Sequence, residues 1–241
     1  MKATDFEFRH RALINVIHFG LAFSAYAIDR TNIVQGAVQS TIGSESPHAH
    51  VFVRGLFAAG ALLVGLASAL RTWAAAYLRS DVVHDPNLRA DTLIADGPYR
   101  YVRNPLYLGT FLLALGLGLL ASRLGFVVLV GGMILRGFRL IGREQAELEE
   151  QQGEGFREFC RRVPQLIPSL HPRVAPRGLK PRWGQAFTGE FFMWGFFGAM
   201  LLCTVTLDMK LAGLLIGAIL LVHYLQRFIR KFGRQHEDVS E

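Results

Sequence analysis

Two short polar segments carry the residue types from which a ligand site can be built. Residues 91–109 read DTLIADGPYRYVRNPLYLG, and residues 143–148 read REQAEL. They supply tyrosine rings, several arginines, the carboxylate of Glu144 and, at Asn104–Tyr107, the first N–H groups of a helix. Helix N–H groups attract anions, carboxylates bind cations, and aromatic faces stack on rings or cations. Together these groups suit a zwitterionic ligand that carries an aromatic ring.

The chain that must position these segments has the composition of a membrane protein. Of its 241 residues, 51% are hydrophobic and only 19% are charged, and the mean hydropathy is +0.28. A helix rises about 1.5 Å per residue, so roughly 17 to 20 apolar residues approach the thickness of a bilayer core. We therefore predict an all-α, polytopic integral membrane protein with about six transmembrane helices. The stretches without charge are 12–28, 55–70, 105–121, 124–135, 191–207 and 211–226.

The net charge of +7 follows the predicted membrane rather than a nucleic-acid surface. With the N-terminus inside, 22 of the 26 lysines and arginines fall on the inner side. The positive-inside rule then places both termini in the cytoplasm. The excess of basic residues therefore indicates how the chain is oriented in the membrane and where it contacts anionic lipid headgroups. No nucleic acid is expected as a partner. The four basic residues outside are Arg30, Arg54, Arg123 and Lys210.

A helical hairpin is predicted to bring the two polar segments together at the inner boundary. Asn104 is a favourable helix cap, and Pro105 suits the first helical position. Ser122-Arg123 is the only polar break before the next apolar stretch, so the two helices are expected to form a tight antiparallel pair. Small residues allow such helices to approach closely in lipid. The glycines expected to do so are Gly109, Gly116, Gly118, Gly125, Gly131 and Gly132.

The positions of charged residues and glycines also indicate where the predicted units of the chain begin and end. The second arm of the hairpin leaves the membrane as an amphipathic helix that Gly153 interrupts. The loop pair His48 and His50 has no nearby ligand partners, so no metal site is predicted. The predicted units are N-terminal transmembrane helices (1–76), a core with connector, hairpin and amphipathic extension (77–170), a linker rich in Pro and Arg (171–189), and a C-terminal transmembrane hairpin with a basic tail (190–241).

The two polar segments also form an ordered pair of motifs. GPYRYVRNPLYLG at 97–109 is followed by Arg143-Glu144-Gln145 and then by Leu148, Gly153, Phe156, Phe159, Val163-Pro164 and Ile167-Pro168. This pair resembles the isoprenylcysteine carboxyl methyltransferase and phospholipid methyltransferase family, in its bacterial membrane form. The resemblance covers roughly residues 77–170, and the flanking helices carry no such signature.

The resemblance implies transfer of a methyl group from S-adenosylmethionine to a membrane lipid or a lipidated small molecule. Arg139 and Arg143 are then expected to position the acceptor, because a guanidinium binds a carboxylate or a phosphate well. For this reason, methylation of a carboxylate ranks ahead of methylation of a phospholipid amine or a small thiol. The implied cofactor contacts are Leu93, Ile94, Tyr99, Asn104, Pro105, Leu106, Tyr107 and Glu144.

This sequence departs from the family pattern at three positions. Asn104 stands where the family has histidine, Gln145 replaces a second acidic residue, and Asp91 stands where histidine is common. A sulfonium methyl is already activated, so alignment and dry surroundings matter more than a titrating side chain. Asn104 is therefore compatible with the chemistry.

Other interpretations of the same residues stay open at this stage. The tyrosines Tyr99, Tyr101 and Tyr107 also suit an interfacial aromatic belt. Glu144 could instead form a structural ion pair with Arg103 or Arg139, and Arg139 could extend to lipid headgroups. At the level of the whole protein, the alternatives are an NADPH enzyme of sterol-reductase type and a non-catalytic membrane adaptor.

Overall fold

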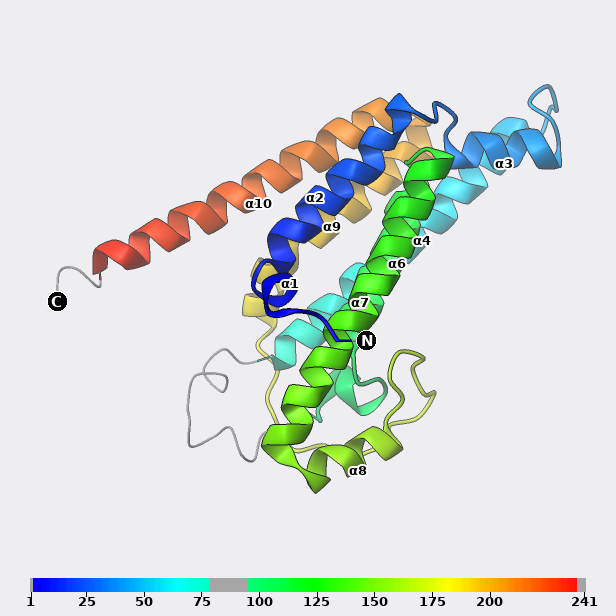
Figure 1. Ribbon diagram of the computed structural model, residues 1–241. Coiled ribbons are helices and arrows are strands. Elements are labelled where there is room, and N and C mark those ends of the chain that lie inside the picture. Colours follow the sequence, from blue (N-terminus) through cyan, green and yellow to red (C-terminus); the bar gives the residue numbers. More distant parts are fainter. Residues whose placement is uncertain (1, 79–94, 238–241) are drawn as a thin grey trace.

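A computed structural model describes residues 2–78 and 95–237 of the chain. The described residues form helices and no strand, as Figure 1 shows, which confirms the predicted all-α class. The elements are α1 (Asp5–Arg9), α2 (Arg11–Ser24), η1 (Ala25–Ala27), α3 (Ile33–Thr41), α4 (Ala49–Tyr77), η2 (Gly97–Arg100), α6 (Pro105–Gly118), α7 (Arg123–Gln152), α8 (Glu154–Arg162), α9 (Trp183–Thr206) and α10 (Met209–Glu237).

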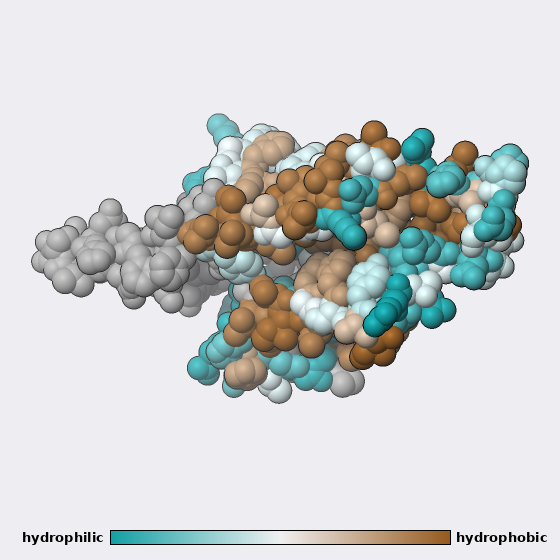
Figure 2. Space-filling view, turned by 90° about the horizontal axis from the view of Figure 1, so that it is seen from above, coloured by the Kyte–Doolittle hydropathy of each residue, from teal (hydrophilic) through white to brown (hydrophobic). Residues whose placement is uncertain are grey.

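The apolar stretches of the sequence form the apolar helices of the bundle. Helices α4, α7 and α9 are long and apolar enough to cross a membrane, and three shorter apolar helices cover 13–27, 105–118 and 209–225. Large apolar side chains such as Leu62, Val127 and Val205 are exposed on these helices. Figure 2 shows hydrophobic residues covering much of one face of the molecule. These features confirm a polytopic membrane protein, because lipid is the solvent that accepts such a surface.

Helix α4 is the central element of the bundle and packs against both α6 and α9. Phe57 and Val64 of α4 meet Leu113 of α6 and Met193 and Met200 of α9 in the largest buried apolar cluster. A second cluster joins α2 to α7. The hairpin of α6 and α7 is therefore held from both sides, by α4 on one side and by α2 on the other.

The glycines of the hairpin mostly face these outer helices. A Cβ atom on Gly116 would lie 2.7 Å from the carbonyl oxygen of Gly60 in α4, and one on Gly125 would lie 2.3 Å from that of Ala22 in α2. Among the six predicted glycines only Gly118 faces the opposite arm, while Gly131 has open space. The expectation that all six join α6 to α7 is therefore wrong, because α4 and α2 make the close approaches.

Helix α3 lies between the first two apolar stretches, where the hydrophobic pattern of the sequence predicts no helix. Its cap is Asn32, whose side-chain oxygen accepts hydrogen bonds from the Val34 and Gln35 N–H groups. The Asn32 amide also donates to the carbonyl oxygens of Leu119 and Ala121 at 3.0 and 2.9 Å. A buried asparagine thus fixes α3 on the turn between α6 and α7. Helices α3 and α8 mark opposite ends of the bundle (Figure 1).

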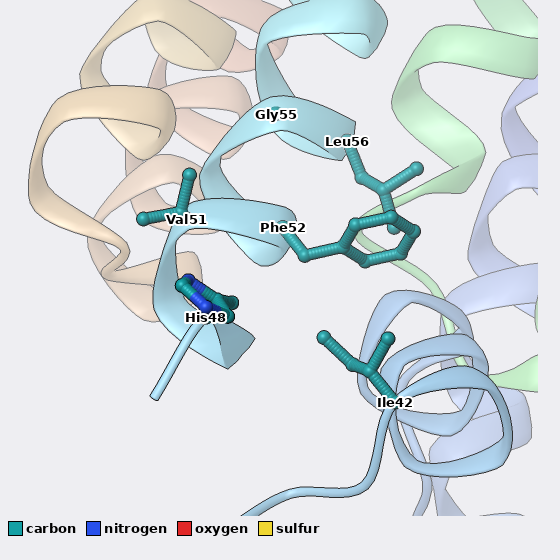
Figure 3. A pocket seen from close by; sticks show the side chains of 6 residues that line it. All are labelled: Ile42, His48, Val51, Phe52, Gly55 and Leu56. Carbon is teal, nitrogen blue, oxygen red and sulfur yellow. The ribbon is translucent and has the colours of Figure 1, made fainter. Parts of the chain in front are cut away.

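A hollow in the surface lies near α3, at the start of α4. It is lined by Ile42, His48, Val51, Phe52, Gly55 and Leu56. Figure 3 shows the side chains of Ile42, Phe52 and Leu56 pointing toward one another across it. At the rise per residue of a helix, this groove lies roughly 28 Å along α4 from Arg71, which is near the other end of the helix. The groove is therefore distant from the two motifs.

Candidate active site

The first motif, at residues 97–109, begins with a tight turn. Gly97 has a φ of +57°, and a Cβ atom there would lie 2.4 Å from the Tyr77 ring, so only glycine fits. The carboxylate of Asp96 accepts hydrogen bonds from the backbone N–H groups of Arg177 and Leu179 at 2.9 and 3.2 Å. The turn of η2 that follows places Tyr99 in the interior.

The second motif braces the first through backbone hydrogen bonds. The Arg103 N–H donates to the Pro164 carbonyl at 2.8 Å, and the Ser169 N–H donates to the Tyr101 carbonyl at 3.0 Å. Phe156, Phe159 and Val163 bury their side chains against Ala95, and this packing anchors α8. The Phe and Val-Pro positions of the second motif are distant in sequence from α6. They therefore hold in place, through packing, the segment that leads into this helix.

Tyr107 and Glu144 meet at the centre of this arrangement. The Tyr107 hydroxyl donates a hydrogen bond of 2.8 Å to Glu144 Oε1, across 37 residues of sequence. Glu144 forms no ion pair with any residue that the structure describes, so the expected alternative of a bridge to Arg103 or Arg139 is not observed. The charge of Arg11 acts on Glu144 without forming an ion pair with it. A partly buried carboxylate without a direct ion pair is costly and favours a cationic ligand.

The start of α6 differs from the prediction in one respect. Pro105 occupies the first turn as expected, but the Asn104 side chain caps no helix N–H group. The Asn104 amide instead donates to the Gln165 carbonyl at 3.1 Å, because the bracing segment lies close enough to accept it. Within the described residues, the N–H groups of Leu106 and Tyr107 have no hydrogen-bond partner, and the first helical bond is that of Leu108 to Asn104. The helix start is thus open to an anionic ligand group.

Tyr99 and Tyr101 occupy different environments. Tyr99 is 9% exposed, and burial raises the pKa of its hydroxyl above the usual value, with the charges of Arg71, Glu144 and Glu190 nearby. Its burial argues against an interfacial belt position. Tyr101 packs on Trp73 with ring centroids 5.9 Å apart, where α4 leaves the apolar region.

Arg139 and Arg143, the predicted acceptor-positioning residues, are engaged by the N-terminal helix. Arg139 pairs with Glu7 at 2.8 Å, and Arg143 pairs with Asp5 at 2.6 Å. The Arg143 guanidinium also lies 4.7 Å from the centroid of the Phe8 ring. The hydrogen bond from Arg139 holds the pKa of Glu7 at about 2. Both arginines therefore already bind carboxylates, although these belong to the chain itself.

The other predicted cofactor contacts lie at the start of α6 or outside the described residues. Pro105 is buried and Leu106 is partly buried at the start of α6. Leu93 and Ile94, like Asp91, lie outside the described residues. The cofactor-binding roles of all these residues stay predictions.

One polar contact beside this site was missed by sequence reasoning. Arg71 of α4 binds Glu190 of α9 through two hydrogen bonds, of 2.8 and 2.9 Å. A second face of the same guanidinium donates to the Leu106 carbonyl at 3.3 Å and to the Thr110 hydroxyl at 3.0 Å. The only sequence signal is Gly109, where a Cβ atom would lie 2.5 Å from Arg71 Cγ.

Residues 56–154 match the phospholipid methyltransferase family model. This confirms the resemblance for that segment. The phospholipid methyltransferase segment runs from α4 to the end of α7 and contains Arg71, Tyr107 and Glu144, whereas Glu190 lies outside it.

Two curated relatives match parts of the same chain. The cobalt-zinc-cadmium resistance protein CzcN of Cupriavidus metallidurans is 29% identical over 48% of this chain and 50% of its own length. The protein-S-isoprenylcysteine O-methyltransferase of Schizosaccharomyces pombe is 31% identical over 38% of this chain and 39% of its own length. The chain thus spans half or less of these relatives. No solved structure matches the chain.

Proposed function

We propose that the chain is a membrane methyltransferase that uses S-adenosylmethionine and methylates a carboxylate on a lipid-like or prenylated acceptor. The observation that carries this proposal is the hydrogen bond between Tyr107 and Glu144. It joins the two motifs inside the phospholipid methyltransferase segment. It also lies next to the open start of α6, so groups for an anion and for a cation are adjacent.

The side chains fit the chemistry of this cofactor. When bound, S-adenosylmethionine supplies a methyl group that its positively charged sulfur has already activated. The N–H groups of Leu106 and Tyr107, which have no partner among the described residues, suit a carboxylate, and the carboxylate of Glu144 suits an amine or ribose hydroxyls. The rings of Tyr99 and Tyr107 offer surfaces for adenine or for a sulfonium. Leu93 and Ile94 are expected to contribute apolar contacts.

A carboxylate acceptor demands little acid–base chemistry from the protein. A carboxylate carries its own lone pair and releases no proton on methylation, so the residues need only align it and exclude water. The name of the Schizosaccharomyces pombe relative, an isoprenylcysteine O-methyltransferase, supports this acceptor class. Arg139 and Arg143 already hold the carboxylates of Glu7 and Asp5, and this supports their proposed role in positioning an acceptor carboxylate.

The description of the matching family favours a second candidate, methylation of a phospholipid amine. An ammonium must lose a proton before it can attack, and Glu144, which forms no ion pair with a described residue, is a carboxylate beside Tyr107 that could accept it. Methylation of an amine should therefore speed up as pH rises through the acceptor's own pKa. Methylation of a carboxylate should not depend on pH in that range.

The placement of the site supports a cytoplasmic location for the chemistry. Arg136, Arg139 and Arg143 of α7 and the arginines of α8 lie toward this end of the bundle. By the positive-inside rule we assign this end, with both termini, to the cytoplasm, beside anionic headgroups. A bacterial inner membrane is the setting we propose.

Equilibrium binding of S-adenosylmethionine to purified, folded protein tests the proposal. Binding should be lost in Glu144→Ala and Tyr107→Ala and retained in the control His223→Ala, on α10. Labelled cofactor added to lipid extracts should then yield a methyl ester. A methylated amine would select the second candidate. Binding of NADPH instead would indicate a reductase, and a folded protein that binds neither cofactor would indicate an adaptor.

A further inference from the structure

The pair of Arg71 and Glu190 is unusual because both charges are withdrawn from water in an apolar bundle. Their side chains are 19% and 10% exposed, respectively. Removing two charges from water costs about as much as their attraction returns, so a buried ion pair is weak support for stability alone. The pair therefore calls for a role other than holding α4 to α9.

The helix pair α4 and α9 already has simpler polar links on either side. The Ser68 hydroxyl donates to the Met193 carbonyl at 3.0 Å, and the Trp194 indole donates to the Thr72 hydroxyl at 3.0 Å. Both links lie within one helical turn of Arg71 along α4. Neither of them touches α6.

Arg71 differs because it reaches the first turn of α6. Its Nη1 donates to the Leu106 carbonyl, and the Thr110 hydroxyl donates to the same oxygen at 2.9 Å. The carbonyl of Leu106 and the N–H group of Tyr107 belong to one planar peptide unit. Fixing the carbonyl therefore fixes the direction of the N–H group. A donor on the carbonyl also polarises that N–H group toward an acceptor.

Glu190 completes this arrangement by fixing Arg71 itself. Its two oxygens take two of the guanidinium nitrogens, Nε and Nη2, in a bidentate pair, and this leaves Nη1 directed at α6. Gly109 leaves room for the Arg71 stem to pass α6. One carboxylate on α9 thereby controls the orientation of a peptide unit in α6.

We propose that Arg71 and Glu190 are positioning residues, which hold the Leu106–Tyr107 peptide so that the Tyr107 N–H binds the carboxylate of S-adenosylmethionine. The inference rests on the proposed function and deepens it. It also gives α9, which lies outside the phospholipid methyltransferase segment, a part in the cofactor site.

The test compares cofactor affinity with thermal stability in the purified full chain. Arg71→Met combined with Glu190→Met replaces the ion pair by apolar side chains, which is often neutral or stabilising. Arg71→Lys keeps a positive charge but lacks the planar fork needed to reach both Glu190 and Leu106. Ser68→Ala is the matched control, because it removes a link between α4 and α9 without touching α6.

We expect the affinity for S-adenosylmethionine to fall about ten-fold in the Met pair and in Arg71→Lys, the loss expected for a charge-assisted hydrogen bond. Adenosine, which lacks the carboxylate, should bind the variants and the parent equally. The unfolding temperature of Arg71→Lys should stay close to that of Ser68→Ala, which should keep full affinity. Unchanged cofactor affinity in Arg71→Lys, or an equal loss for adenosine, would overturn the inference. A parent protein that binds no S-adenosylmethionine would instead overturn the proposed function.

Discussion

The hydroxyl of Tyr107 connects two helices at Glu144, a partly buried carboxylate that forms no ion pair with a described residue. Its hydrogen bond to Glu144 joins the first turn of α6 to the second half of α7. The bond orients the Tyr107 ring and one oxygen of the carboxylate, and leaves the second oxygen of Glu144 for a ligand. The two residues should therefore act as one unit in cofactor binding.

A double-mutant cycle measures this coupling. Tyr107→Phe keeps the ring and removes the donor, and Glu144→Gln removes the charge while keeping the shape. We expect each change to weaken S-adenosylmethionine binding, and the effects to be non-additive by about 1–3 kcal/mol, because both remove the same charged hydrogen bond. Calorimetric titration of the four proteins gives the coupling free energy.

The matched control for this cycle is Tyr26→Phe. The Tyr26 hydroxyl also bonds between elements, to the Leu120 carbonyl at 2.8 Å, but at the other end of the bundle. Its removal should leave cofactor affinity unchanged. Strictly additive effects of the two site variants would show that Tyr107 and Glu144 contact the ligand independently.

The sequence allowed one of the two polar contacts at the site to be predicted. Tyr107 and Glu144 follow from the hairpin, because the short turn at Ser122 fixes how α6 and α7 lie beside each other. Arg71 and Glu190 are 119 residues apart, and each reads as an ordinary charge flanking an apolar stretch. Pairing them requires knowledge of how α4 and α9 pack, which hydrophobic pattern alone does not determine.

At the scale of elements, the short helix α1 docks on α7 through charge. Thr4 and Glu7 form a capping box, so Glu7 stabilises α1 and also reaches Arg139. The Ala3 N–H group donates to the Arg139 carbonyl at 3.0 Å, which adds a backbone contact. Docking of α1 therefore depends on the charge of Glu7.

This docking should depend on pH in a defined direction. The pKa of Glu7 is lowered from 4.5 to about 2 by the hydrogen bond from Arg139. A lowered carboxyl pKa stabilises the docked state fully above about 4.5, and this contribution is lost as pH falls toward about 2. The mobility of a nitroxide at Arg9→Cys should therefore stay low from neutral pH to about 4.5 and rise below it. In the Glu7→Gln background the acid-induced step should disappear, and its persistence would assign the step to another group.

The crossing of α4 and α6 should tolerate no side chain at Gly116. A Cβ atom there would lie 2.6 Å from Val64 Cγ2 and 2.7 Å from the Gly60 carbonyl oxygen. Gly116→Ala should lower the free energy of unfolding in mixed micelles by about 1–3 kcal/mol through overpacking. Gly131→Ala, in α7 with nothing within 4 Å, should instead raise it by up to about 1 kcal/mol through helix propensity. Equal effects at the two positions would argue against this helix crossing.

Helix α3 is an element that the hydrophobic pattern of the sequence does not predict. Its span from Ile33 to Thr41 is too short and too polar to appear as an apolar stretch, so the hydrophobic pattern does not predict it. The local signal was Asn32, a favourable cap, but its amide contacts with the hairpin turn are long-range. Long apolar helices could be predicted because burial in lipid imposes their length, whereas short helices depend on tertiary partners.

At the scale of the whole molecule, charge is distributed unevenly between the two ends of the bundle. Arginines and glutamates form chains of ion pairs on α8, whereas the end near α3 has a single ion pair, Arg123 with Asp29, among the described residues. The site lies at the end near α8, which the proposed orientation places in the cytoplasm. In that orientation, the proposed soluble cofactor enters from the cytoplasm.

Cysteine labelling of intact cells tests this orientation. Ser44, between α3 and α4, and Glu150, near the end of α7, are exposed at opposite ends of the bundle. In a chain whose native Cys160 and Cys203 are replaced by serine and alanine, a membrane-impermeant maleimide should label Ser44→Cys in intact spheroplasts. Glu150→Cys should react only after the membrane is permeabilised, because the helices that separate the two positions cross the bilayer. The reverse pattern would place the site outside the cell, away from the intracellular supply of S-adenosylmethionine, and would contradict the proposed function.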